Sequence, residues 1–130
     1  MRDSATPSFR RTPNAWRAPA RALVRAALAA WGLRSVEDSG VLIVTELVAN
    51  AARHTSTRAV RVTITRPAET SVRIAVADKS QRAPEFAVAG DSGETGRGLA
   101  VIDALSCRWG TDRLPWGKRV RAELAYAANS

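Results

Sequence analysis

The sequence predicts an α+β domain in which helices cover one face of a mixed, mainly antiparallel sheet. Two long segments, 14–31 and 35–54, carry apolar residues at helical spacing, and a third helix is expected at about 97–106. Other segments alternate apolar and polar residues, as strands with one buried face do. The chain of 130 residues has the length of one domain and can bury a core without disulfides or metals.

The composition of the chain excludes several classes of protein. It is 45% hydrophobic and 25% charged, as in ordinary soluble proteins. No apolar run reaches the roughly 18 residues of a membrane span, and the basic start of the chain lacks the apolar region of a secretory signal. A single cysteine, Cys107, and a single histidine, His54, exclude a disulfide framework and zinc sites with several such ligands. We expect a cytoplasmic protein.

The net charge of +8 could indicate a nucleic-acid binder, an acidic partner or a phosphate-bearing ligand. Of the 20 cationic residues, only Lys79 and Lys118 are lysines, and the others are arginines dispersed along the chain. This excess of arginine, together with the many alanines, indicates a high-GC coding bias. Arg17, Arg21 and Arg25 line one side of the first predicted helix, where a solvated flank is a simpler interpretation than phosphate binding. Nucleic-acid binding is therefore kept only as an alternative.

The first half of the chain is predicted to contain a mobile arm or short edge strand at 1–13, followed by two helices. Gly32 is the candidate C-cap of the first helix, at 14–31. Ser35 is the expected N-cap of the second helix, which continues to about His54. The apolar stripe of the first helix consists of Ala20, Leu23, Val24, Ala27, Leu28 and Trp31.

The second half of the chain is predicted to contain four strands and the third helix. Valine and isoleucine alternate with other residues in the first two strands and again at the end of the chain. A long segment without periodicity precedes the third helix, and such a loop is uncommon in a small domain unless it is functional or disordered. In chain order, the elements are strands 60–65 and 72–77 with a turn at 66–70, the loop 79–95, helix 97–106, and strands 108–111 and 118–126 with a turn at 114–117.

The second predicted helix carries a polar stripe on an otherwise apolar surface. Glu46 and Asn50 are four residues apart and share one face, which Arg53 and His54 continue. A carboxylate on a buried helix is costly unless something pairs with it. One interpretation is an ion pair between Glu46 and Arg53 beside a hydrogen-bonded Asn50 amide. The other is a pocket lining in which the Asn50 carbonyl oxygen binds a hard cation such as Mg²⁺.

Asp78 ends a predicted strand and follows Val72, Ile74 and Val76 at two-residue spacing, so it points to the same side as these core residues. A polar residue in this place either caps a turn or faces a ligand. The first interpretation is an Asx-type turn at 78–80. The second is a buried acceptor for an exocyclic amine, such as that of a purine.

Residues 93–99, Gly-Glu-Thr-Gly-Arg-Gly-Leu, form a glycine-rich segment that runs into the third predicted helix. Backbone N–H groups at a helix N-terminus can bind an anion, and glycines let a phosphate approach the chain. The segment lacks the lysine and the spacing of a P-loop, and it does not follow a buried strand as a dinucleotide fingerprint would. A flexible linker remains the alternative.

The polar stripe, Asp78 and the glycine-rich segment follow one another in an order that resembles a known protein superfamily. Residues 46–54, Asp78 at a strand end, and residues 96–99 resemble the N, G1 and G2 boxes of the GHKL ATPase superfamily. Within it, the short chain and the Glu-x-x-x-Asn-x-x-x-His pattern look like the anti-sigma-factor serine/threonine kinases and their actinobacterial relatives. The resemblance covers about residues 15–125, and the helix motif is its most specific part.

The resemblance implies a Bergerat-type two-layer α/β sandwich that binds ATP between the helices and a lid at 79–95. By analogy, Asn50 would bind Mg²⁺, Asp78 would accept a hydrogen bond from the adenine amine, and Glu46 would be the general base. The remaining nucleotide-binding candidates are Arg53, His54, Gly96, Arg97, Gly98 and Leu99.

By the same resemblance, residues 14–126 would be a single ATP-binding domain, with a tail at 127–130. The function would be phosphorylation of a small antagonist protein on serine or threonine, with binding of a sigma factor or an anti-anti-sigma-type protein and a homodimer as further expectations. No membrane partner is expected. The alternatives are a catalytically silent binding module of the same fold and a basic nucleic-acid binder, whereas a histidine-kinase fragment would need a dimerisation helix for which the chain has no room.

Two positions depart from the superfamily pattern. Asp-x-Gly-x-Gly is replaced by Asp-Lys-Ser-Gln-Arg at 78–82, with Ser80 at the third position. In the last strand, where many relatives place a threonine near adenine, this chain is expected to have Arg119.

Overall fold

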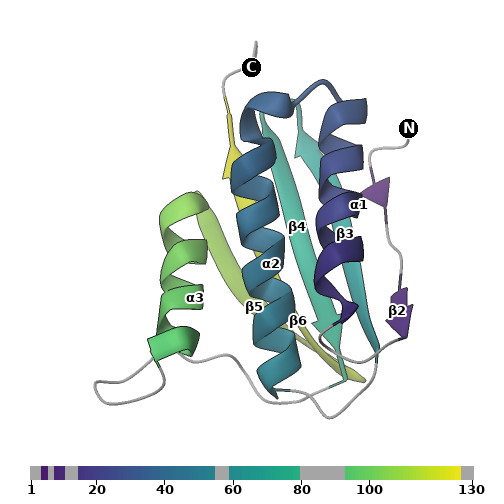
Figure 1. The fold of residues 1–130 in the computed structure, drawn as a ribbon, viewed down its shortest axis with the longest axis vertical. Coiled ribbons are helices and arrows are strands. Elements are labelled where there is room, and N and C mark those ends of the chain that lie inside the picture. Colours follow the sequence, from purple (N-terminus) through teal and green to yellow (C-terminus); the bar gives the residue numbers. More distant parts are fainter. Residues whose placement is uncertain (1–3, 6–7, 11–14, 55–58, 80–92, 127–130) are drawn as a thin grey trace.

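The computed structural model describes residues 4–5, 8–10, 15–54, 59–79 and 93–126. Three α-helices cover one face of the sheet, and none of the described helices covers the other, which is here called the open face (Figure 1). The strand order is β1-β3-β4-β6-β5, with β2 also pairing with β3, and every described pairing is antiparallel. The predicted α+β class, with helices on one face of the sheet, is confirmed. No helix among the described residues is long and apolar enough to cross a membrane.

The elements follow the predicted order, with changes at their ends. A short 3-10 turn precedes the second helix at Arg34–Val36. In chain order the elements are β1 (Ser4–Ala5), β2 (Ser8–Arg10), α1 (Arg17–Ala30), α2 (Glu37–His54), β3 (Ala59–Ala68), β4 (Ser71–Asp78), α3 (Gly93–Leu105), β5 (Arg108–Leu114) and β6 (Gly117–Ala125).

Two helix caps were predicted in the connection between α1 and α2, and the structure confirms the first and contradicts the second. Gly32 adopts a φ of 74° just after α1, as the predicted C-cap requires, and the N–H of Leu33 donates to the carbonyl oxygen of Leu28 at 2.8 Å. The prediction that Ser35 caps α2 is wrong, because Ser35 lies inside the 3-10 turn and the helix begins at Glu37.

The third helix begins earlier than its sequence suggests. The glycines at 93–98 predict a loop, yet α3 starts at Gly93. Leu99 and Ile102 are 1% and 0% exposed, and α3 packs against α2. Packing of this face against the core therefore outweighs the low helix propensity of glycine.

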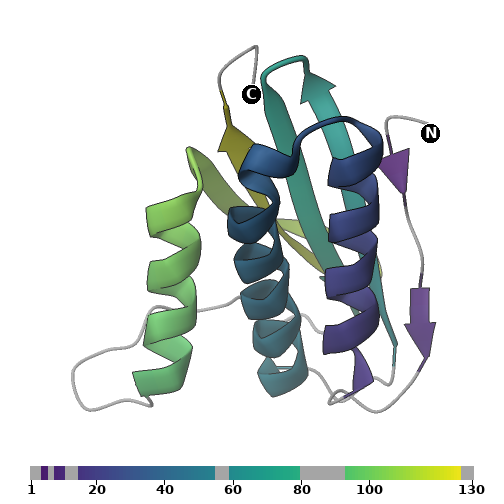
Figure 2. The ribbon, with the colours of Figure 1, turned by 45° about the horizontal axis from the view of Figure 1, so that its top comes forward.

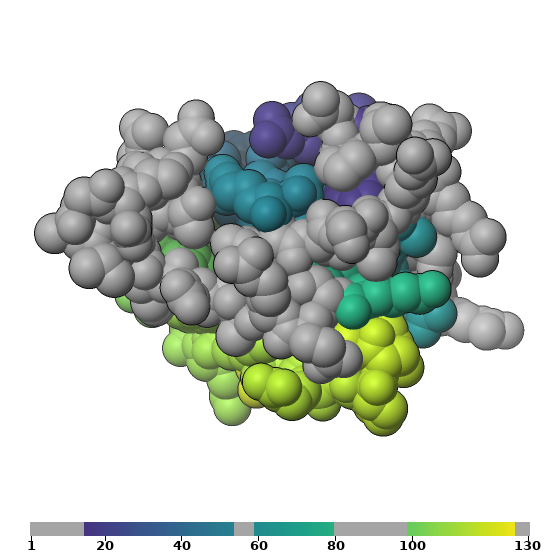
Figure 3. Space-filling model, turned by 90° about the horizontal axis from the view of Figure 1, so that it is seen from below, coloured from purple at the N-terminus to yellow at the C-terminus, as the bar shows by residue number. Residues whose placement is uncertain are grey.

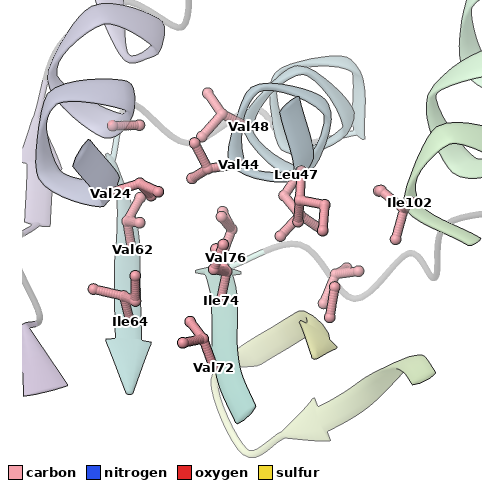
Figure 4. Packing of buried hydrophobic residues seen from close by; sticks show 14 of the residues in the cluster. Val24, Val44, Leu47, Val48, Val62, Ile64, Val72, Ile74, Val76 and Ile102 are labelled. Atoms are coloured by element: carbon pink, nitrogen blue, oxygen red, sulfur yellow. The ribbon is translucent and has the colours of Figure 1, made fainter. Parts of the chain in front are cut away.

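Helix α2 lies between α1 and α3 over the middle of the sheet (Figures 1 and 2). Helix α2 is buried on most sides, as predicted. Its backbone also packs closely against side chains of α1. A Cβ atom on Gly40 would lie 3.0 Å from Leu28 and 3.1 Å from Val24. Figure 4 shows Val44, Leu47 and Val48 of α2 pointing into the core, whose other labelled residues are Val24, Val62, Ile64, Val72, Ile74, Val76 and Ile102.

The face of the sheet away from the helices is charged. Arg73 donates to the Glu123 carboxylate, with an Nη2–Oε1 distance of 2.6 Å. Asp112 binds Arg119 at 2.9 Å and Arg121 at 3.3 Å. Partly exposed ion pairs of this kind contribute about 0–1 kcal/mol each, so the stability of the fold rests on the helix-covered side of the sheet.

Replacing Leu47 with alanine should lower the free energy of unfolding by about 2–5 kcal/mol, because the lost side chain leaves a cavity. Leu47 is 1% exposed. Leu42→Ala is the matched control, since Leu42 belongs to the same helix and is 50% exposed. Its effect should stay within about 0.5 kcal/mol. Urea unfolding followed by circular dichroism measures both variants, and equal losses would contradict this packing of α2.

Candidate functional site

The candidate residues come from elements that meet at one end of the domain. The C-terminal end of α2, the end of β4, the start of α3 and the turn between β5 and β6 all lie at the lower end in Figure 1. Figure 3 looks onto this end, where atoms of α2, α3 and the β5–β6 hairpin reach the surface. The three segments singled out in the sequence therefore lie at the same end of the domain.

Asn50 is the most unusual polar residue among those the structure describes. Its side chain is buried, at 3% exposure, and neither Nδ2 nor Oδ1 has a hydrogen-bond partner among the described residues. A buried polar group without a partner costs about 1–3 kcal/mol. The described residues therefore provide no partner that would make Asn50 a satisfied core amide.

The proposed ion pair between Glu46 and Arg53 is also absent from the described part of the chain. Glu46 is half-buried, and Arg53 is exposed. The side chain of His54 lies outside the described residues. The described side chains of the polar stripe on α2 therefore form no ion pair with one another.

The direction of the stripe follows from the helix geometry. Leu47 lies beside Ile102 of α3 (Figure 4). Asn50 is three residues after Leu47 and so lies on the same side of α2, nearer the helix end. Its amide is thus directed to the side of α2 that α3 covers, toward the end where α3 begins. A helix N-terminus carries unpaired N–H groups and a positive partial charge, which favour a phosphate.

Asp78 ends β4 at 2% exposure, on the side of the sheet that the helices cover. This is the side that the two-residue spacing predicts. Its cross-strand neighbour in β6 is Lys118, which is also 2% exposed. Gly117 holds β6 close to β4, because a Cβ atom there would overlap the carbonyl oxygen of Asp78. The end of β4 therefore presents a buried carboxylate toward the helical layer.

The glycine-rich segment is not the loop that the sequence predicts. Gly96, Gly98 and Leu99 lie within α3, and Leu99 belongs to the core. In a helix that begins at Gly93, the unpaired amides are those of the first four residues, whereas later amides are bonded within the helix. Amides at 93–96 are therefore better placed to meet an anion than those of Gly98 and Leu99. The side chain of Arg97 and the whole of Ser80 lie outside the described residues.

The expectation for Arg119 is wrong in its placement. Arg119 lies on the open face of the sheet, where it binds Asp112, and not on the side of Asp78. Lys118 occupies the inner position, and sequence reasoning missed it. The alternation of β6 could have found it, because Lys118 precedes Val120, Ala122 and Leu124 at two-residue spacing.

The residues at this end fit a magnesium ion bound together with a phosphate. No group of three or more His, Cys, Asp or Glu residues in the described ranges could hold a metal on its own. Mg²⁺ in phosphate-transfer sites takes only one or two protein oxygens and fills its other positions with phosphate and water. The unpartnered carbonyl oxygen of Asn50 is such a ligand.

Comparison with known proteins identifies the family. No curated protein matches the chain. The family model for the histidine kinase-like ATPase domain matches residues 9–124, which include all three segments of the site. Domains of this type bind ATP, usually with Mg²⁺. The chain therefore belongs to the family of histidine kinase-like ATPase domains.

Proposed function

We propose that this chain is an ATP-dependent serine/threonine protein kinase of the anti-sigma type, which acts on a small antagonist protein. The observation that carries the proposal is the buried amide of Asn50, which has no hydrogen-bond partner in the described part of the chain. A fold that leaves two polar atoms unsatisfied in its interior loses stability unless a ligand bonds them. Mg²⁺ with the phosphates of ATP is the ligand that both the family and the side-chain chemistry favour.

In the proposed complex, each residue has one task. Asn50 holds the metal, and the buried carboxylate of Asp78 accepts a hydrogen bond from the purine. The amides that begin α3 face the phosphates. The metal, when bound, neutralises phosphate charge, and phosphoryl transfer depends mainly on such neutralisation and on positioning. Arg53 and His54, at the end of α2, complete the set of nucleotide-binding candidates.

Glu46 is the proposed general base. It lies one helical turn before Asn50 on α2 and is half-buried, so it can reach both the phosphate site and a partner. Glu46 takes the proton from a serine or threonine hydroxyl of the partner while that oxygen attacks the γ-phosphorus. The bond between the γ-phosphorus and the bridging oxygen breaks, and ADP leaves with the electron pair.

The partner remains a proposal that rests on the family resemblance. An anti-anti-sigma-type protein would supply the hydroxyl, and a sigma factor would bind the same chain, which could act as a homodimer. A binding module that holds ATP without transferring phosphate would share the fold and the Asn50 site. It differs only in what Glu46 does, so the two functions are separated by experiment.

Replacing Asn50 with leucine should abolish Mg-ATP binding and leave the free protein as stable as the wild type or more stable. Leucine has the same number of side-chain heavy atoms, branched at the same carbon, and removes two polar atoms, so the free energy of unfolding should rise by about 1–3 kcal/mol. Urea unfolding and calorimetric titration with Mg-ATP give the two readouts. A marked loss of stability, or Mg-ATP binding as tight as in the wild type, would count against the metal-binding role of Asn50.

Glu46→Gln should slow phosphate transfer by about 10²–10⁴-fold, the contribution of a general base. Mg-ATP affinity should change by no more than about threefold, because Glu46 does not hold the nucleotide. The assay follows radiolabelled phosphate from ATP into a panel of purified anti-anti-sigma-type proteins. Glu37→Gln, at the opposite end of α2, is the matched control and should transfer phosphate at the wild-type rate. Unchanged transfer by Glu46→Gln would remove Glu46 from the mechanism.

A further inference from the structure

The open face of the sheet carries an excess of positive charge that the proposed phosphate transfer does not use. Its side chains alternate with the buried ones of β3, β4 and β6, and cross-strand pairing extends the same rows onto β5. On these four strands the face holds five arginines and two carboxylates, an excess of three positive charges. They are Arg61, Arg73, Arg108, Arg119, Arg121, Asp112 and Glu123.

The carboxylate of Asp112 is shared by two arginines. Its Oδ2 atom lies 2.9 Å from Nη2 of Arg119 and 3.3 Å from Nε of Arg121. Gly110 makes room for this arrangement, because a Cβ atom there would overlap the guanidinium of Arg121. One carboxylate cannot neutralise two guanidinium groups, so the cluster keeps a positive charge.

The same arrangement recurs in the next row of the face, where Glu123 is shared by Arg73 and Arg108. The distances are 2.6 Å from Nη2 of Arg73 and 3.1 Å from Nε of Arg108. Partly exposed ion pairs add little to stability, and guanidinium groups gathered around too few carboxylates repel one another. Stability alone therefore does not account for this arrangement. Its effect is to hold four arginine side chains in place on a face that stays positively charged.

An exposed aromatic side chain adjoins these arginines. Trp116, in the turn between β5 and β6, is 45% exposed, and the guanidinium carbon of Arg61 lies 5.8 Å from its ring centroid. This contact is a cation–π interaction, which orients both side chains. Tryptophan and arginine are among the residue types that contribute most binding energy at protein interfaces. The open face therefore combines oriented cations with an apolar anchor.

We propose that the open face is the docking surface for an acidic segment of a partner protein. Carboxylates of the segment would bind the arginines that share Asp112 and Glu123, and an apolar side chain of the segment would pack on Trp116. The proposal does not depend on nucleotide binding, because this face lies on the other side of the sheet from Asn50 and Asp78.

The charges of the face favour a protein over other occupants. A phosphate backbone would meet Asp112 and Glu123 among the arginines, whereas a peptide can place its carboxylates beside guanidinium groups and an apolar residue elsewhere. Charge-assisted hydrogen bonds between guanidinium and carboxylate groups are strong and directional. A second copy of the chain would bring the same excess of positive charge to the interface, and like charges across an interface oppose binding.

The test uses a fluorescent peptide in which glutamates flank one central phenylalanine. Its binding to the full chain is followed by fluorescence anisotropy near physiological ionic strength, where attraction between distant charges is largely screened. The wild type should bind this peptide saturably. The same peptide with glutamines in place of the glutamates should bind at least about tenfold more weakly, because its hydrogen bonds lack the carboxylate charge.

The double variant Arg119→Gln/Arg121→Gln should raise the Kd of the glutamate peptide by at least about tenfold, because two charged donors are lost. Arg17→Gln/Arg21→Gln is the matched control, since it removes the same charge from α1, in the helical layer. The control should change the Kd by less than about threefold. Trp116→Ala leaves both ion-pair clusters in place and should raise the Kd by at least about fivefold.

Circular dichroism establishes that each variant is folded, and Trp116→Ala decides alone should the double variant unfold. A smaller loss of affinity than expected in either folded variant overturns the proposal. So does an equal loss in the α1 control, or equally tight binding of the glutamine peptide.

Two further outcomes would assign the face to another occupant and so overturn the proposal. One is tighter binding of a single-stranded oligonucleotide than of the glutamate peptide, with the same dependence on Arg119 and Arg121. The other is a homodimer in analytical ultracentrifugation that the double variant disrupts. Mg-ATP titration of the same variants reports separately on the proposed nucleotide site, and its result leaves the docking surface untouched.

Discussion

Burial of α2 is the constraint on which the rest of the structure depends. The helix contacts α1, α3 and the middle of the sheet, so the side chains on its buried faces are expected to be apolar. Asn50 is an exception, because the same packing that stabilises the helix removes water from its amide, and no described residue is its hydrogen-bond partner. In the proposed function, stability and ligand binding therefore oppose each other at Asn50, and a ligand at the α2–α3 end would satisfy its amide.

The sheet sets the other half of the site through its register. The pairing of β4 with β6 brings Asp78 and Lys118 opposite each other at the ends of two apolar rows. These polar residues appear where the rows leave the core, at the same end of the domain as the start of α3 (Figure 1). Metal, phosphate and purine contacts would thus come from a helix, a helix start and a strand pair that the core already holds rigid.

The spacing of apolar residues was enough to predict those helices and strands whose sequences follow a single regular pattern. Val60, Val62 and Ile64 alternate clearly, and the apolar surface of α2 has helical spacing, so both elements and the side of Asp78 followed from spacing alone. The start of α3 could not be predicted, because local glycine propensity opposes helix and only the burial of Leu99 decides the outcome.

The candidate site was predicted in part for similar reasons. The stripe of Glu46 and Asn50 was visible as polar residues on an apolar helix, whereas the lack of bonding partners for Asn50 is a property of three-dimensional packing. Lys118 was overlooked because a lysine near a turn usually lies in solvent. Its residue type does not indicate burial, whereas its two-residue spacing from Val120 and the register with β4 do.

The central claim is that the ends of several elements bind one nucleotide together. It is tested most directly by a ¹⁵N NMR titration of the full chain with a non-hydrolysable Mg-ATP analogue. Saturable shifts should appear together, with one dissociation constant, in the amides at the end of α2, the end of β4, the start of α3 and the β5–β6 turn. Amides in the middle of α1 should stay unchanged. Shifts confined to the open face of the sheet, or no saturable shifts near Asn50 and Asp78, would contradict a nucleotide site between these elements.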